Sequence, residues 1–151
     1  MLFRSRRDDH RLTWLVSITS SIAIVTGTVV TGSGPHAGDE KARRLPFEIE
    51  TVARFHGTAV IIALLSIVAF ILHLRRTRRL ASPLATSLET VLGIGVVQGA
   101  VGYTQYFAGI PAALVGVHIA LATAFFAAVV NLHLTATGRI PTSETVGSST
   151  H

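Results

Sequence analysis

Four long apolar stretches constrain the fold of this chain more than any other feature. They run from Thr13 to Gly32, Gly57 to Leu72, Thr90 to Phe107 and Pro111 to Leu132, and none contains a charged residue. With a few flanking residues, each approaches the roughly 20 residues that cross a hydrocarbon core of ~30 Å as a helix. The sequence therefore predicts an all-α integral membrane protein, a bundle of four transmembrane helices at about 13–32, 52–74, 86–107 and 111–134.

The composition supports this class. Of the 151 residues, 49% are hydrophobic and only 14% are charged, which is more apolar than a soluble domain of this size. Four arginines precede the first stretch, as they would in a signal peptide, but the apolar run is long for a signal. We interpret it as a retained helix.

Basic residues predict the orientation in the cell membrane. They cluster before the first stretch, after the second and after the fourth, at Arg4, Arg6, Arg7 and Arg11, at Arg75, Arg76, Arg78 and Arg79, and at Arg139. The first connection mixes both signs and the third has no charge, so both termini should be cytoplasmic. This predicts a cytoplasmic basic segment at 1–12, a membrane domain at 13–136 and a disordered cytoplasmic tail at 137–151. The net charge of +5 then reflects topology, and we expect membrane lipid rather than nucleic acid as a partner.

Two histidines are the strongest functional signal. His56 and His118 should lie roughly 7 and 9 Å inside the outer ends of the second and fourth helices, at one shared level. Two neutral imidazoles from neighbouring helices are what a six-coordinate haem iron needs, although spacing alone favours simple interhelical hydrogen bonding equally. Gly57 and Gly116 would leave room for a flat macrocycle beside the two ligands. Because the chain has no cysteine, such a haem would be held without covalent attachment.

A second histidine pair, His73 and His133, lies at the inner ends of the same two helices. Their helical phases differ from those of His56 and His118 by about 100° and 60°, so both cannot readily face the bundle axis. Interfacial snorkelling is the favoured interpretation for this pair.

The third helix and the outer loops contain further polar candidates. Gln98 should bond across to another helix or to a ligand, with the packing role favoured. Tyr103, Gln105 and Tyr106 suit either an interface belt or a pocket rim. The turn-rich segment 33–39 could cover a cofactor, and several basic residues lie where haem propionates would emerge: His36, Lys41, Arg43, Arg44 and Arg54.

Four ordered segments between about Trp14 and His133 carry a family resemblance. They are Gly27-Thr28-Val29-Val30-Thr31-Gly32-Ser33-Gly34-Pro35-His36-Ala37-Gly38-Asp39, Arg54-Phe55-His56-Gly57, Gln98-Gly99-Ala100-Val101-Gly102-Tyr103 and Gly109-Ile110-Pro111-Ala112-Ala113-Leu114-Val115-Gly116-Val117-His118. Together they resemble the C-terminal four-helix half of haem A synthase, a duplicated eight-helix membrane fold. The resemblance implies that His56 and His118 are the axial ligands of a haem b. It also implies a role in converting haem O to haem A for cytochrome oxidase.

The chain departs from the family where its catalytic half would need a carboxylate. That half has a glutamate three residues before a histidine and often a cysteine pair, whereas this chain has Ala53 at that position and no cysteine. Glu50, six residues before His56, does not match, so no catalytic residue is assigned. We expect either a homodimer or a missing N-terminal half, with a haem O synthase as supplier of the substrate. A non-catalytic b-type cytochrome or haem-handling protein is the alternative, and a structural bundle that binds nothing is the third.

Overall fold

The computed structural model describes residues 2–35 and 43–138, with side chains from residue 7 onward. Within these residues the chain is all-helical, with α1 (Leu2–Ser33), α2 (Ile49–Arg76), α3 (Pro83–Phe107) and α4 (Ala112–Ala136). Each helix is long and apolar enough to cross a membrane. The prediction of four such helices is confirmed. The predicted tail lies outside the described residues from 139 onward.

The first helix begins well before its apolar run. We predicted a helix start near Thr13 and a separate basic segment before it, but α1 begins at Leu2 and contains 32 residues. Arginine is a good helix former, so the polar segment continues the helix rather than ending it. At 1.5 Å per residue α1 is about 48 Å long, well beyond a hydrocarbon core of ~30 Å. The other predicted boundaries lie within three residues of those observed.

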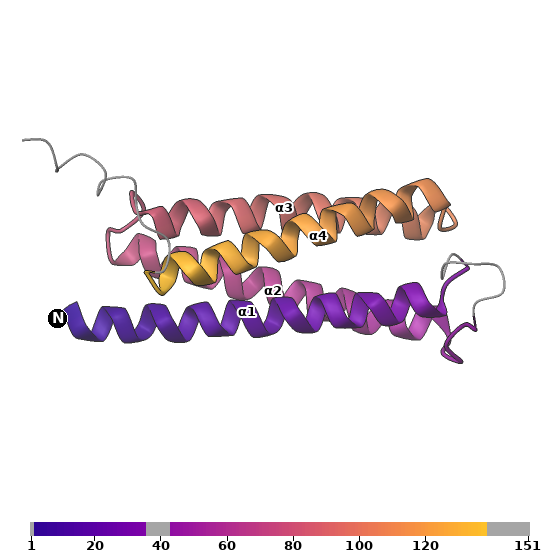
Figure 1. Cartoon of the computed structure of the whole chain (residues 1–151), viewed down its shortest axis with the longest axis horizontal. Helices are drawn as coiled ribbons and strands as arrows, with labels where there is room; N and C mark the ends of the chain where they lie inside the picture. Colours follow the sequence, from indigo (N-terminus) through magenta and orange to yellow (C-terminus); the bar gives the residue numbers. More distant parts are fainter. Residues whose placement is uncertain (1, 36–42, 139–151) are drawn as a thin grey trace, which may run out of the picture.

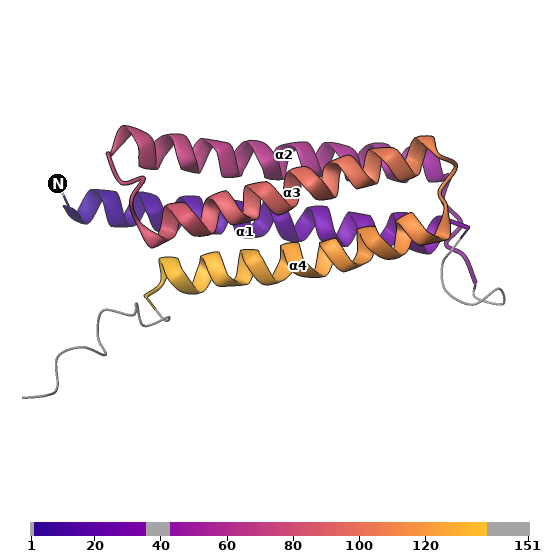
Figure 2. The same cartoon turned by 90° about the horizontal axis from the view of Figure 1, so that it is seen from above.

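The four helices form two antiparallel hairpins that lie side by side along one axis (Figures 1 and 2). α1 packs on α2 and α3 packs on α4, while α1–α4 and α2–α3 contacts join the hairpins. Among the described residues, α2 and α4 therefore face each other diagonally. We call the end with the start of α1 and the end of α4 the terminal end, and the end with the α1–α2 and α3–α4 connections the loop end. Figure 1 shows the hairpins close together at the terminal end and further apart at the loop end.

Two helices end in turns with left-handed residues. After α2, Arg78 has φ 56° and the N–H of Arg79 donates to the Leu74 carbonyl at 2.8 Å, the pattern of a helix C-cap. After α3, Gly109 has φ 77° and Ile110 has φ 58°. The left-handed backbone conformation is unusual for a β-branched residue such as Ile110. With it, the chain reverses direction in four residues and α4 begins.

The large buried side chains lie in the terminal half of the bundle, meaning residues 7–22, 63–95 and 125–138. This half holds one continuous apolar cluster: Val16, Ile67, Phe70, Leu74, Leu84, Ala85, Leu88, Val91, Phe125, Val129 and Leu132. In the loop half, residues 23–35, 43–62 and 96–124, the only buried residues are Ala23, Gly34 and Ala59. The loop half therefore contains no large buried apolar side chain among its described residues.

Candidate cofactor site

His56 and His118 meet across the bundle in the loop half. Their ring centres are 6.4 Å apart and their planes are 87° apart. His56 is seven residues after the start of α2 and His118 six after the start of α4, so they lie about 10.5 and 9 Å along their helices. The two histidines thus share one level on diagonally opposed helices.

The His56 ring is held by the neighbouring helix of its own hairpin. Its Nδ1 lies 3.0 Å from the Ala23 carbonyl oxygen and 3.3 Å from Thr26 Oγ1 on α1. Because a carbonyl oxygen only accepts, Nδ1 must carry the proton, and Nε2 keeps its lone pair. A histidine that binds a metal usually has this arrangement, with its second nitrogen donating to a carbonyl or carboxylate.

His118 is held by a side chain instead. On α3, the amide nitrogen of Gln98 lies 3.0 Å from the His118 carbonyl oxygen and 3.3 Å from His118 Nε2. The Nδ1 atom of His118 is buried and has no hydrogen-bond partner among the described residues. The packing role expected for Gln98 is confirmed, since it bonds across to α4.

Two glycines on the adjacent helices allow the rings to sit close to the backbone. A Cβ added at Gly27 would lie 3.0 Å from His56 Cε1, and one added at Gly102 would lie 3.0 Å from His118 Cε1. Gly27 is four residues after Ala23, and Gly102 is four after Gln98, so the two hairpins repeat one arrangement. Gly57 and Gly116, which we expected to leave room for a macrocycle, face open space and contact neither ring. Neighbours in sequence point to other faces of the helix.

The spacing of the pair suits one metal ion between two imidazoles. A metal–imidazole bond is about 2.0 Å, and the nitrogen lies roughly 1.2 Å from its ring centre, which would place two opposed ring centres about 6.4 Å apart. Among the described residues, no three His, Asp or Glu side chains gather closely enough to hold a bare ion.

Buried polar atoms without partners lie around the pair. They are His118 Nδ1 and Gln98 Oε1. Unpaired buried polar atoms are rare in folded proteins and often mark a position where a ligand or water completes the bonding. The histidines, the glycines and Gln98 thus fit a polar-edged, flat group. Gln105 Oε1 is also buried and unpaired, but it lies seven residues and about 10 Å further along α3.

The other predicted outer residues lie away from the pair. Arg54 is exposed and pairs with the exposed Glu50 at 3.5 Å, and Arg44 donates to the Pro35 carbonyl at 3.2 Å. The side chains of Tyr103 and Tyr106 are exposed, which favours an interface belt over a pocket rim. His36, Lys41 and most of the 33–39 segment lie outside the described residues.

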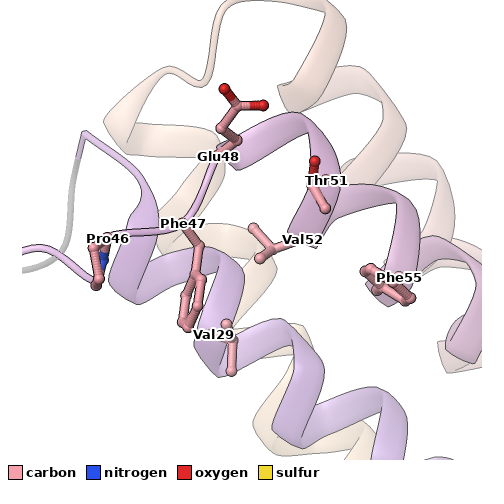
Figure 3. A pocket seen from close by; sticks show the side chains of 7 residues that line it. All are labelled: Val29, Pro46, Phe47, Glu48, Thr51, Val52 and Phe55. Carbon is pink, nitrogen blue, oxygen red and sulfur yellow. The ribbon is translucent and has the colours of Figure 1, made fainter.

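A separate hollow opens on the outside of the α1–α2 hairpin (Figure 3). It has a volume of about 430 Å³ and is lined by Val29, Pro46, Phe47, Glu48, Thr51, Val52 and Phe55. This hollow does not include either histidine of the pair.

The second histidine pair does not form a matching site. His73 Nε2 is buried and lies 3.4 Å from Asp9 Oδ1, and Asp9 also pairs with Arg79. His133 Nδ1 lies 3.3 Å from Ser17 Oγ. His73 thus contacts a carboxylate that the extension of α1 brings to it, a contact that the sequence pattern did not predict. The two inner histidines have different partners, as their helical phases indicated.

Comparisons of the chain with models of protein families, with curated proteins and with solved structures found no match.

Proposed function

We propose that this chain is a membrane-inserted haem protein in which His56 and His118 hold a haem b as axial ligands. The observation that supports this most is the facing pair itself, at 6.4 Å between ring centres, in a half of the bundle without large buried side chains. When bound, the haem would supply one-electron redox chemistry. The hydrogen bond from His56 Nδ1 to the Ala23 carbonyl would leave Nε2 free to bind the metal, and Gly27 and Gly102 let the helix backbones lie close to the rings.

The proposed orientation places the terminal end of the bundle in the cytoplasm. Arg7, Arg11 and the Arg75–Arg79 connection lie at that end, whereas the described loop end mixes Arg43, Arg44 and Arg54 with Glu48 and Glu50. Such a bias of basic residues sets orientation in membranes. A reporter fused at Arg78 should therefore report a cytoplasmic location. A reporter fused at Pro35 should report a location outside the membrane. A fusion at Arg78 that reports an outside location would contradict the orientation.

Within this class, we propose the role of the haem b-holding half of a haem A synthase. The resemblance of the four segments and the diagonal histidine pair support it, and it would require a second half or a second copy to rebuild eight helices. Haem O, delivered by its synthase, would then be the substrate of the complete assembly.

A non-catalytic b-type cytochrome is the alternative, and one observation favours it. The nearest candidate carboxylate in the sequence, Glu50, has an exposed side chain that pairs with Arg54 rather than with the histidines. Methyl oxidation to a formyl group needs a positioned polar group beside the substrate. The chain by itself should therefore hold haem without making haem A.

Pigment chemistry separates the two functions. The chain would be expressed in a host that makes haem O but has no haem A synthase, and extracted pigments would be separated by chromatography. We expect protohaem on the purified protein and unchanged haem O in the cells. Haem A in those cells would overturn the half-enzyme proposal and favour a catalytic homodimer.

Ligation is tested in the same purified protein. His56→Ala and His118→Ala should each abolish the low-spin haem spectrum, while His73→Ala and His133→Ala should leave it nearly intact. A normal bis-histidine spectrum in His118→Ala would contradict the ligand assignment.

A further inference from the structure

The two histidines of the pair are held in chemically different ways. We propose that Gln98 is a positioning residue that makes His118 the exchangeable ligand of the bound haem and leaves His56 as the fixed one. This inference rests on the haem site proposed above. It adds that the ligand exchanged at the iron would be the one from α4.

The orientation of the Gln98 amide follows from its contact with backbone. Its nitrogen lies 3.0 Å from the His118 carbonyl oxygen, and only the NH₂ group of an amide can donate to a carbonyl. The same nitrogen lies 3.3 Å from His118 Nε2, which must then accept through its lone pair. That lone pair is the one a metal would use. In the metal-free chain, the lone pair of His118 Nε2 that would bind a metal is therefore engaged in the hydrogen bond from Gln98.

His56 has no such competitor. Its hydrogen bonds to Ala23 and Thr26 are made at Nδ1, and Nε2 makes none among the described residues. A metal can bind His56 without breaking a protein hydrogen bond. It can bind His118 only after the hydrogen bond from the Gln98 amide to Nε2 is broken. One hydrogen bond changes such an equilibrium by roughly three- to tenfold. His118 should consequently leave the iron more readily than His56, and Gln98 should stabilise the released imidazole.

Gln105 provides a matched control. Like Gln98, it is a half-buried glutamine of α3 whose Oε1 is buried and unpartnered, but it makes no hydrogen bond to His118. Replacing either glutamine by leucine removes one amide from the same face of the helix. Only Gln98→Leu removes the amide that competes with a metal for His118 Nε2.

The hydrogen bond is tested first without haem. Nitrogen NMR of metal-free protein labelled with ¹⁵N-histidine should show His118 Nε2 unprotonated and shifted by a hydrogen bond. Gln98→Leu should move that resonance, and Gln105→Leu should not. An Nε2 resonance that is unchanged in Gln98→Leu, or is protonated in the wild type, would overturn the inference whether or not the chain binds haem.

Ligand exchange is then tested in the haem-loaded protein with carbon monoxide. The iron–carbon vibrations of the ferrous wild-type adduct should match those of His118→Gly, in which His56 is the only axial histidine. Gln98→Leu should bind carbon monoxide about three- to tenfold more slowly than wild type, because released His118 is no longer held away from the iron, and Gln105→Leu should bind at the wild-type rate. An adduct that matches His56→Gly, no carbon monoxide binding by the wild type, or equal rates in both leucine variants would overturn it. If the chain takes up no haem, the proposed function is wrong. The nitrogen resonances would still test the hydrogen bond between Gln98 and His118.

Discussion

In the terminal half of the bundle, Phe70, Leu88 and Leu132 are fully buried among other large side chains, whereas the inward positions of the loop half are occupied by glycine, histidine and glutamine. Both halves belong to the same four helices. In lipid, helices associate through close packing and interhelical hydrogen bonds, because the solvent is itself apolar. The terminal half has that packing from its own large side chains, and the loop half does not, while buried polar atoms without hydrogen-bond partners occur in both halves. The difference indicates that the terminal half holds the bundle together, and it leaves the loop half as the place for the cofactor that we propose.

The largest effect we expect comes from filling the loop half. A Cβ at Gly102 would already lie 3.0 Å from His118 Cε1, so Gly102→Leu should displace the ring and lower haem affinity about tenfold or more. Gly99→Leu is the matched control, because it lies on the same helix facing open space. Haem content per chain after purification measures both. Equal haem content in the two variants would remove the role assigned to Gly102.

Removing a phenylalanine should matter in only one half. Phe70 is fully buried in the terminal half, while Phe55, on the same helix in the loop half, is 68% exposed. Phe70→Ala should lower the free energy of unfolding by about 2–3 kcal/mol, at or below the low end of values for buried cores because lipid replaces part of the lost contact. Phe55→Ala should change it by less than about 0.5 kcal/mol. Denaturation in detergent micelles compares the two, and similar losses would contradict the division into halves.

The smallest effect concerns the charges at the two ends. Asp9 is buried and pairs with Arg79 at the terminal end, whereas Glu50 and Arg54 form an exposed pair at the loop end. Asp9→Asn should cost about 1–2 kcal/mol, since it removes the charge partner of a half-buried arginine. Glu50→Gln should cost within about 0.5 kcal/mol, as is typical of an exposed pair. The same unfolding measurement applies, and a larger loss in Glu50→Gln would reverse the ranking.

The parts of the fold that repeat along the chain were predictable from sequence. Uncharged runs near 20 residues indicated four helices, and the position of His56 and His118 within two of them indicated a shared level. The start of α1 was missed because counting apolar residues cannot detect a helix that continues through arginines into water. The parts that depend on contact between distant residues were also missed. Asp9 meets Arg79 only through packing, and nothing local marks that pair.

The meeting of His56 and His118 was predictable from the sequence, whereas the residues that hold their rings were not. His56 was visible as an ionisable residue in an apolar run, but its supports are Ala23 and Thr26, about 30 residues earlier on another helix. The glycines that lie against the rings, Gly27 and Gly102, were not predicted, because they come from the partner helix of each hairpin. Helical periodicity shows which residues share a face of one helix. It does not show which face of a neighbouring helix that face contacts.

Haem titration of the metal-free chain tests the central claim that the space between His56 and His118 is a cofactor site. Ferric protoporphyrin IX would be added to purified protein in detergent, with absorption and electron paramagnetic resonance spectra recorded at each step. We expect saturation at one haem per chain with a low-spin bis-histidine signal from the first addition. Uptake that never saturates and equals that of empty micelles, or equal binding by a His56→Ala/His118→Ala double variant, would contradict the claim.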